Sequence, residues 1–211
     1  MTQFSAETVT LDAARADAVE PEVAGRLLHA TDPHIFGFHH GHDEDLAARH
    51  LGHQWCAGAG LFSHRFATGA YAGDRLVGFE LGYGRETQEA NVGAFVGQAQ
   101  AFLDDAQFAQ LARWFEYGPF VIPPTPGDAY YLSNLAALPE ARGRGIGEKL
   151  LLNAFEKARA AGHARVQLDV YEGNPAFRLY ERVGMRTVVE TRVPPLEAEG
   201  IGLHLRMELR L

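Results

Sequence analysis

Two stretches of the chain alternate hydrophobic and polar residues, and both are expected to form antiparallel strands. Between His64 and Tyr83, two strand-like runs meet at Gly73 and Asp74, a pair typical of tight turns, which predicts a β-hairpin. Near the C-terminus every second residue is hydrophobic, namely Leu203, Leu205, Met207, Leu209 and Leu211. A half-buried strand turns such residues inward and the intervening ones outward, here His204, Arg206, Glu208 and Arg210.

The first sixty residues combine one strand-like run with two helical ones. Capping and turn-forming residues separate these runs and set their expected ends. The predicted elements are a strand over Val9–Arg15, a helix over Glu20–Ala30, a loop over residues 34–42, and a helix from Asp43 or Asp45 to about Ala57.

Residues 85–127 carry a helical spacing of large hydrophobic side chains where a third strand would end and a fourth begin. The pattern includes Phe95, Phe102, Phe108, Leu111 and Phe115. Three prolines at 123, 124 and 126 then end it, because proline fits neither a helix interior nor a central strand. Two arginines stand against five acidic residues in this segment. The pattern predicts an acidic helical insertion carried on a sheet.

Beyond the insertion the chain alternates strand, helix, strand and helix, and then ends in two strands. The predicted ranges are 129–138, 146–162, 164–171, 174–184, 185–193 and 201–211. No internal repeat is visible. We therefore expect all 211 residues to form one mixed α/β (α+β) domain, with residues 85–127 as an embellishment.

Composition excludes several classes of protein. The net charge of −8 is unfavourable for general nucleic-acid binding and suits a cationic or neutral small partner. A single cysteine, Cys56, excludes a disulfide framework and a cysteine-based zinc site. No run of eighteen apolar residues predicts a membrane span, and the first ten residues have neither the basic nor the apolar part of a secretory signal. A cytoplasmic location is expected.

The segment Ala141–Gly147, ARGRGIG, lies between a predicted strand and a predicted helix. Its glycines permit a tight turn in which several N–H groups point into one concavity, and the helix adds the positive end of its dipole. Six basic and two acidic residues between Arg142 and Arg165 give a local charge of +4. This combination predicts a site for a phosphate or pyrophosphate.

Two common phosphate-binding motifs fit this turn poorly. A P-loop requires Lys and then Ser or Thr after its last glycine, where this chain has Glu148 and Lys149. A dinucleotide-binding turn is the stronger alternative, because Asp169 ends the next strand where a ribose-binding acid belongs. However, the third small residue of that motif falls on Leu150, and the turn does not leave its strand directly at a glycine.

The same residues resemble the GNAT superfamily of acyl-CoA-dependent N-acyltransferases. The pyrophosphate motif of that family is matched by Arg142-Gly-Arg-Gly145-Ile-Gly147, and the preceding Leu-Ala-x-x-Pro by residues 135–139. A second motif is matched by Asn174 followed by Leu179-Tyr180-Glu-Arg-Val-Gly184-Met185. The resemblance is close over residues 130–185. It implies a mostly antiparallel, mixed sheet of about seven strands, split between the fourth and fifth and flanked by helices.

The resemblance also implies how acetyl-CoA is bound. The fourth strand should bend at a bulge and leave the fifth, so that main-chain groups of Leu135, Ala136 and Ala137 pair with the pantetheine arm like an added strand. A freed N–H there would polarise the thioester carbonyl. The other implied contacts are Arg142, Gly143, Arg144, Gly145, Ile146, Gly147, Glu148, Asn174 and Tyr180. Asn174 lies six residues before Tyr180, one fewer than usual, and could instead cap a helix that begins at Pro175.

Three side chains are candidates for catalysis by direct attack of an amine on the thioester. Tyr180 is the expected general acid for the departing thiolate, since a phenol is protonated at neutral pH; a core tyrosine is the alternative. Asp169 matches in position an acid of the ribosomal-protein N-terminal acetyltransferase branch, and Glu80 lies on the hairpin strand opposite. Either could remove the amine proton, and either could instead be a salt-bridged strand residue.

The remaining chemically notable residues are histidines and the cysteine. His34, His39, His40 and His42 are close enough in sequence to suggest a metal, but no carboxylate completes a familiar site, so we expect a solvated or substrate-lining loop and no metal requirement. Cys56 is expected to be a buried small hydrophobe.

The sequence thus predicts an acetyl-CoA-dependent N-acetyltransferase that acts on a small, cationic amine. A protein N-terminus or side chain is the alternative acceptor, and a catalytically silent acyl-CoA-binding module is the contrasting possibility. The insertion should project over the acceptor, with its acidity favouring a cation; its aromatic residues could instead cover a homodimer interface. No nucleic acid and no membrane is expected as a partner.

Overall fold

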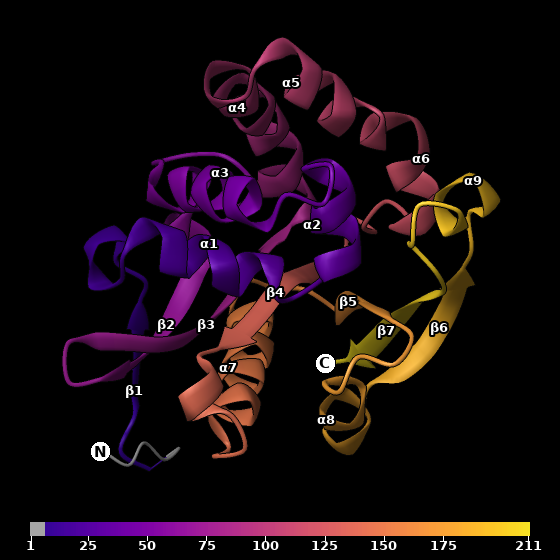
Figure 1. Ribbon diagram of the computed structural model, residues 1–211. Coiled ribbons are helices and arrows are strands. Elements are labelled where there is room, and N and C mark those ends of the chain that lie inside the picture. The colour runs from indigo at the N-terminus through magenta and orange to yellow at the C-terminus, as the bar shows by residue number, and fades with distance from the viewer. Residues whose placement is uncertain (1–6) are drawn as a thin grey trace.

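A computed structural model describes residues 7–211, so the first six residues of the segment tested above for a secretory signal lie outside it. A seven-stranded sheet runs through the protein in the order β1-β2-β3-β4-β5-β7-β6 (Figure 1). All neighbours pair antiparallel except β4 and β5, which pair parallel. The strands are β1 (Thr10–Ala13), β2 (Ala67–Ala72), β3 (Arg75–Gly84), β4 (Ala129–Ala137), β5 (Arg165–Tyr171), β6 (Arg186–Thr191) and β7 (His204–Arg210). The predicted GNAT-type sheet is confirmed.

Helices cover both faces of this sheet. On β3, Phe79 packs against Trp55 on one face, with ring centroids 4.7 Å apart, while the next residue, Glu80, bonds Lys157 on the other. The helices of the first face are α1 (Pro21–His29), α2 (Pro33–His39) and α3 (Glu44–Cys56), and the opposite face carries α7 (Ile146–Ala160) and α8 (Phe177–Arg182). Short 3-10 turns occupy Ala16–Ala18, His64–Phe66 and Pro139–Ala141.

The predicted loop over residues 34–42 is wrong, because α2 begins at Pro33. Asp32 caps this helix: its side chain accepts hydrogen bonds from the main-chain N–H groups of His34 and Ile35. Proline at the first helical position adds a favourable backbone angle. Asp43, and not Asp45, caps α3. The sequence signal for α2 was therefore an Asp-Pro helix start in front of a short, histidine-rich run.

The predicted insertion is helical and lies between β3 and β4, as expected. It consists of α4 (Arg85–Phe102), α5 (Asp105–Ala112) and α6 (Trp114–Val121), which arch over α2 and α3 at the top of Figure 1. Phe95 and Leu111 pack with Leu46 of α3, and Val121 packs with Phe38 of α2. Arg113 also pairs with Glu199, beside α9 (Pro194–Glu197). The insertion thus joins the N-terminal helices to the C-terminal strands.

The sheet is split where the resemblance implied. β4 and β5 pair only at their beginnings, Ala129–Tyr131 against Arg165–Gln167, although both strands continue for several residues. β4 also carries a bulge, since Leu132 and Asn134 face consecutive residues of β3 and Ser133 has no partner there. A bulge bends its strand, so the ends of β4 and β5 diverge.

The outward orientation predicted for the polar residues of β7 is wrong at two positions. His204 is 1% exposed and Arg206 is 3% exposed. The alternation remains, but both faces of this strand are covered, because the polar face meets β5, α2 and the chain that follows the insertion. In the described part of the chain, no helix is long and apolar enough to cross a membrane.

Candidate functional site

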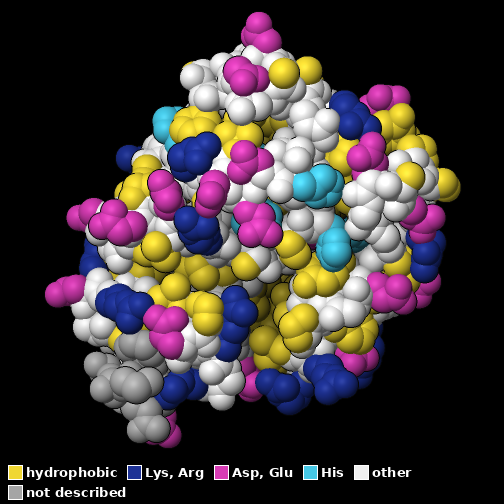
Figure 2. All heavy atoms as spheres, viewed as in Figure 1, with side chains coloured by type: hydrophobic (Ala, Val, Ile, Leu, Met, Phe, Trp, Pro, Cys, Tyr) yellow, Lys and Arg dark blue, Asp and Glu magenta, His cyan; other side chains and the backbone are white. Residues whose placement is uncertain are grey.

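A single cavity of about 1010 Å³ follows the split between β4 and β5 and continues beneath the insertion. The predicted turn and β4 line one end; α2, α4 and α6 line the other. Figure 2 shows a hollow with hydrophobic side chains inside it and basic side chains beside it. We call the end at the turn the donor end and the end beneath the insertion the acceptor end.

The backbone of β4 turns two residues toward the split. Leu138 donates its N–H to the carbonyl of Val77 on β3, and in an antiparallel ladder main-chain groups alternate between the two sides of a strand. Ala136 therefore also faces β3, whereas Leu135 and Ala137 face the split. The prediction that all three pair with an extended ligand is corrected to these two, although all three line the cavity.

The turn before α7 has the geometry of an anion site. Gly143 and Gly145 adopt left-handed φ values of 70° and 78°, which side chains with a Cβ rarely tolerate, and α7 starts immediately afterwards with its unpaired N–H groups. Arg142, Gly143, Gly145, Ile146, Gly147 and Glu148 all line the cavity. Arg144 does not, and its Nε instead donates to the carbonyl of Glu140 at 3.1 Å.

Arginines supply the positive charge of the donor end. Arg142 donates from Nε to the carbonyl of Ala137 at 3.1 Å, which holds it beside the split. Arg178 and Arg182 of α8 also line the cavity, and Arg182 pairs with Glu148 at 2.8 Å. The sequence analysis missed these two arginines. The signal was present, since both lie within the second family motif, at positions where that motif does not specify the residue.

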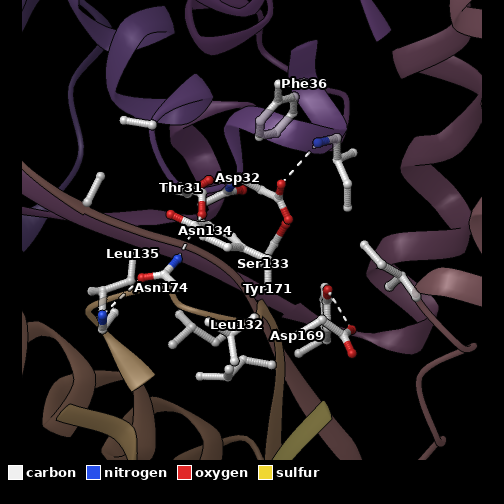
Figure 3. Close-up of a pocket in the computed structure, with 18 of the residues that line it drawn as sticks. Thr31, Asp32, Phe36, Leu132, Ser133, Asn134, Leu135, Asp169, Tyr171 and Asn174 are labelled. Atoms are coloured by element: carbon white, nitrogen blue, oxygen red, sulfur yellow. Dashed lines mark hydrogen bonds between the residues drawn. The ribbon is translucent and has the colours of Figure 1, made fainter. Parts of the chain in front are cut away.

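Asn174 lies at the junction of the donor and acceptor ends, and it also acts as a cap. Its Oδ1 accepts the N–H of Ala176 at 2.9 Å, and its Nδ2 lies 3.5 Å from the carbonyl of Thr31 (Figure 3). Tyr180 of α8 is 7% exposed and lines the same part of the cavity. Burial raises the pKa of its phenol, so the hydroxyl is protonated across the physiological range.

Glu80 lies away from the cavity, on the face of the sheet that α7 covers. Its Oε1 is 2.6 Å from Nζ of Lys157, and Asn153 and Thr68 belong to the same polar cluster. The Glu80 carboxylate is fully buried. This geometry gives Glu80 a structural ion pair, which was the alternative kept for it, and offers no contact with an acceptor.

Asp169 does face the cavity, but both of its oxygens are occupied. Arg206 donates from Nε and Nη2 to the two oxygens at 3.0 and 2.6 Å, and the hydroxyl of Tyr131 donates at 3.0 Å. Burial raises the pKa of Asp169, and the hydrogen bonds from Arg206 oppose that shift. The result is a closed, bidentate ion pair at the acceptor end.

Asp32 is a second carboxylate in the cavity, and the sequence analysis missed it. Its Oδ1 accepts the two N–H groups that begin α2, and its Oδ2 accepts from Nε2 of His204 at 2.9 Å. Figure 3 shows Asp32 beside Ser133, Asn134 and Tyr171, around one part of the cavity. Its side chain is 17% exposed, against 3% for Asp169. Asp32 is therefore the more accessible of the two carboxylates.

The hydrogen bonds of His204 require it to be a cation. Nε2 faces the carboxylate of Asp32, and Nδ1 faces the carbonyl of Gly202 at 3.0 Å; both are acceptors only, so each ring nitrogen must carry a proton. Burial lowers the pKa of His204, but the hydrogen bond and charge of Asp32 outweigh burial, and the net pKa is raised. The sequence analysis could not pair two residues 172 positions apart.

The histidines suspected of binding a metal are separated. His40 donates from Nδ1 to the carbonyl of Phe36, accepts from His50 at Nε2, and His50 accepts in turn from the amide of Gln54. This series of hydrogen bonds gives both ring nitrogens of His40 and of His50 a partner while each ring is neutral. His34 instead packs against Tyr171. Across residues 7–211, no three potential ligands among His, Cys, Asp and Glu gather as a metal would need. Cys56 is exposed, contrary to expectation.

Comparisons with known proteins agree with this geometry. Residues 32–185 match the model of the acetyltransferase (GNAT) family. An N-acetyltransferase from Staphylococcus aureus superposes with a TM-score of 0.71 at 15% identity, over 95% of this chain and all of that one. A second acetyltransferase superposes with a TM-score of 0.63 at 19% identity, over 95% of this chain and 98% of that one. An acetyltransferase from Bacillus subtilis, solved in complex with CoA, superposes with a TM-score of 0.52 at 17% identity, over 96% of this chain and 97% of that one.

No curated protein sequence matches the chain. The family model nevertheless covers residues 32–185, well over half of it, and residues of both family motifs line the donor end of the cavity. The chain therefore belongs to the GNAT acetyltransferase family, whose members use acetyl-CoA.

Proposed function

We propose that the protein transfers an acetyl group from acetyl-CoA to the primary amine of a small molecule. One observation carries the proposal: a single cavity joins the anion-binding turn, the split in the sheet and the carboxylate of Asp32. A donor molecule and an acceptor molecule can therefore meet inside it, at the split, without leaving the protein.

The donor end fits CoA in three respects. The left-handed glycines and the start of α7 suit its diphosphate, and Arg142 can neutralise part of that charge. The split leaves the backbone of Leu135 and the N–H of Ala137 available to the amides of the pantetheine arm. The amide of Asn174 and the phenol of Tyr180 line the same cavity, and we assign them to the path of the thiol. Bound there, acetyl-CoA supplies the activated acyl group.

The acceptor amine must lose a proton before it attacks. An alkylammonium with a pKa of about 10.4 is neutral only about once in a thousand molecules at pH 7, so a positioned carboxylate is useful. Asp32 is better suited than Asp169, because its side chain is 17% exposed against 3% and can still meet an acceptor or a water while His204 and the start of α2 hold it in place. We assign it to orient the ammonium and accept its proton, directly or through one water.

The bonds and protons of the transfer balance with these two residues. The amine nitrogen forms a bond to the acetyl carbon, and the bond from that carbon to sulfur breaks. The ammonium first gives one proton to Asp32, which later releases it to solvent, and Tyr180 donates its phenolic proton to the departing thiolate. The second proton lost by the nitrogen after the attack returns the Tyr180 phenolate to a phenol, directly or through one water. The raised pKa keeps the phenol of Tyr180 protonated and excludes it as the base at neutral pH, while making it a weaker acid than a free tyrosine.

The walls of the acceptor end support a small acceptor over a polypeptide. Helices α4 and α6 of the insertion and α2 line that end, so an acceptor has to fit between the insertion and the N-terminal helices.

A panel of amines tests the proposal. The protein is mixed with acetyl-CoA and, in turn, small primary amines, a peptide with a free N-terminus and a peptide with internal lysines, while thiol release is followed. We expect turnover with small amines. Preferred turnover of a peptide contradicts the small acceptor, and calorimetric binding of CoA without turnover of any amine indicates a silent binding module.

A further inference from the structure

Five aromatic rings line the acceptor end of the cavity, together with aliphatic side chains such as Leu61 and Val92. The rings come from α2, from the segment before β2 and from the insertion: Phe36, Phe62, Phe95, Trp114 and Phe115. Several pack edge to face, with Phe62 between Phe36 and Phe95 at centroid distances of 5.4 and 5.7 Å. Ring edges and faces of this kind favour another ring over a hydrated chain.

Part of this wall exposes hydrophobic surface that no other described segment covers. Phe115 is 45% exposed and Val92 is 38% exposed, and both line the cavity. Large hydrophobic side chains that remain accessible inside a cavity favour an apolar occupant, because covering them releases ordered water.

The charged residues that the insertion contributes to the lining of the cavity carry no net charge. Among its seven charged residues, only Arg85 and Glu89 line the cavity, and they pair with each other at 2.7 Å. His39, on the neighbouring wall, adds no charge, because burial lowers its pKa well below the ordinary value. A second or third ammonium group on an acceptor would therefore meet a neutral, aromatic wall.

The spacing between the carboxylate and the rings sets the shape of the acceptor. Asp32 caps α2 and Phe36 lies four residues later, so the two are separated by about 6 Å along the helix. Figure 3 shows the Phe36 ring on the same side of the cavity as Asp32. A linker of about two carbons between an amino group and a ring would span that distance.

From these observations, and resting on the proposed function, we infer that the acceptor is an arylalkylamine: a primary amine joined to an aromatic ring by a short linker. The amino group lies beside Asp32 at the split, and the ring lies among Phe36, Trp114 and Phe115 under the insertion. Polyamines and other multiply charged amines are disfavoured, since the wall beyond Asp32 offers them no unpaired carboxylate among the described residues.

Two phenylalanines on α6 give a matched test of this inference. Phe115 lines the cavity, whereas Phe120 is 68% exposed and lies outside it. Neither is part of the buried core, so Phe115→Ala and Phe120→Ala should both fold, which thermal melting checks. Values of kcat/KM are measured for 2-phenylethylamine and for 1,4-diaminobutane at saturating acetyl-CoA.

We expect 2-phenylethylamine to exceed 1,4-diaminobutane at least about tenfold in kcat/KM, and Phe115→Ala to reduce this ratio about fivefold. Phe120→Ala should leave the ratio as it is in the unaltered protein. A diamine that is acetylated as well as or better than the aryl amine overturns the inference but preserves the proposed function. So does a ratio that Phe115→Ala leaves unchanged. Binding of CoA without acetylation of any amine overturns both.

Discussion

The donor and acceptor ends of the cavity are built in different ways. The donor end comes from two short, continuous segments, residues 135–148 and 174–182, and its grip depends on backbone conformation. The acceptor end is assembled from α2, β5 and the insertion, with His204 and Arg206 of β7 behind its two aspartates, and it depends on side chains that meet only in the folded protein. A turn built from one short segment can bind the same ligand in many proteins. The acceptor end, built from separate segments, can change its lining without disturbing that turn.

The two ends also handle charge differently. At the donor end, the arginines are exposed; Arg182 pairs with Glu148 and Arg142 bonds a main-chain carbonyl, an arrangement near solvent that suits the exchange of a charged ligand with water. At the acceptor end, Asp32 pairs with His204 and Asp169 pairs with Arg206, both largely buried. A buried ion pair holds its two side chains in place, but both had to lose their hydration. Removing one partner should therefore destabilise the protein, because the other charge stays buried without compensation.

The largest expected effect lies at the acceptor end. Asp32→Asn should lower kcat about 100-fold or more, because it removes the proposed proton acceptor, while Asn can still cap α2. Steady-state kinetics and calorimetry with CoA on the same sample separate the two ends: turnover falls and CoA affinity stays close to that of the unaltered protein.

Asp45→Asn is the control for that substitution. Asp45 is a 75% exposed residue of α3, paired with Arg26 and outside the cavity, so this variant should retain turnover. If Asp32→Asn keeps normal turnover, proton removal must be assigned to water or to Asp169.

A smaller loss is expected where the two ends meet. Tyr180→Phe should reduce kcat about tenfold to 100-fold, since the thiolate then leaves without a proton donor. The matched variant is Tyr130→Phe. The Tyr130 hydroxyl is buried without a hydrogen-bond partner and lies outside the cavity, so its removal should leave kcat unchanged and stability equal or higher. Equal rates for Tyr180→Phe and the unaltered protein would make Tyr180 a packing residue.

The donor end should respond to backbone changes with a loss of affinity. Gly145→Ala forces a Cβ into a left-handed conformation and should weaken CoA binding about tenfold, with about 1–2 kcal/mol of strain in the turn. Gly93→Ala lies on α4, where no neighbouring atom meets the added Cβ, and should raise stability by about 0.5–1 kcal/mol without affecting CoA. Calorimetry and urea unfolding measure both, and equal CoA affinities would show that the turn does not hold the diphosphate.

The smallest effect concerns the pH dependence of stability. The pKa of His204 is raised in the folded protein, so its ion pair with Asp32 should add to the free energy of unfolding. This stabilisation should be complete below about pH 6.5 and should disappear as the pH rises through the folded-state pKa of His204. His204→Gln should therefore cost about 1 kcal/mol more at pH 6 than at pH 9 in urea unfolding. His53→Gln, at an exposed position of α3, should show no such difference. A cost independent of pH would mean that His204 is neutral.

Much of the fold could be predicted from sequence because its signals are local. The turn at Gly73, the alternation in β7 and the prolines that end the insertion each act within a few residues. The split between β4 and β5 came from the family resemblance and is confirmed. The short helix α2 was missed because a run of seven residues is too short to show a clear helical periodicity, although Asp32 and Pro33 marked its start.

In the candidate site too, features with a local sequence signal could be predicted, and features made by distant residues could not. Motif residues such as Gly145 and Tyr180 lie in the cavity, where the motifs implied. Asp32 and His204 could not be paired from sequence, because only the fold brings residues of α2 and β7 together. Glu80 was a candidate because of its strand, but sequence alone could not tell which face it occupies. Whether the protein forms a homodimer or is located in the cytoplasm stays a prediction.

The central claim is that the turn before α7 holds the diphosphate of CoA, and one titration tests it directly. CoA and pantetheine, which lacks the diphosphate and nucleotide, are each titrated into the protein in a calorimeter. We predict that CoA binds at least about 100-fold more tightly, as two charge-assisted hydrogen bonds to phosphate oxygens would provide. Equal affinities for the two molecules, or no heat with CoA, would contradict the account.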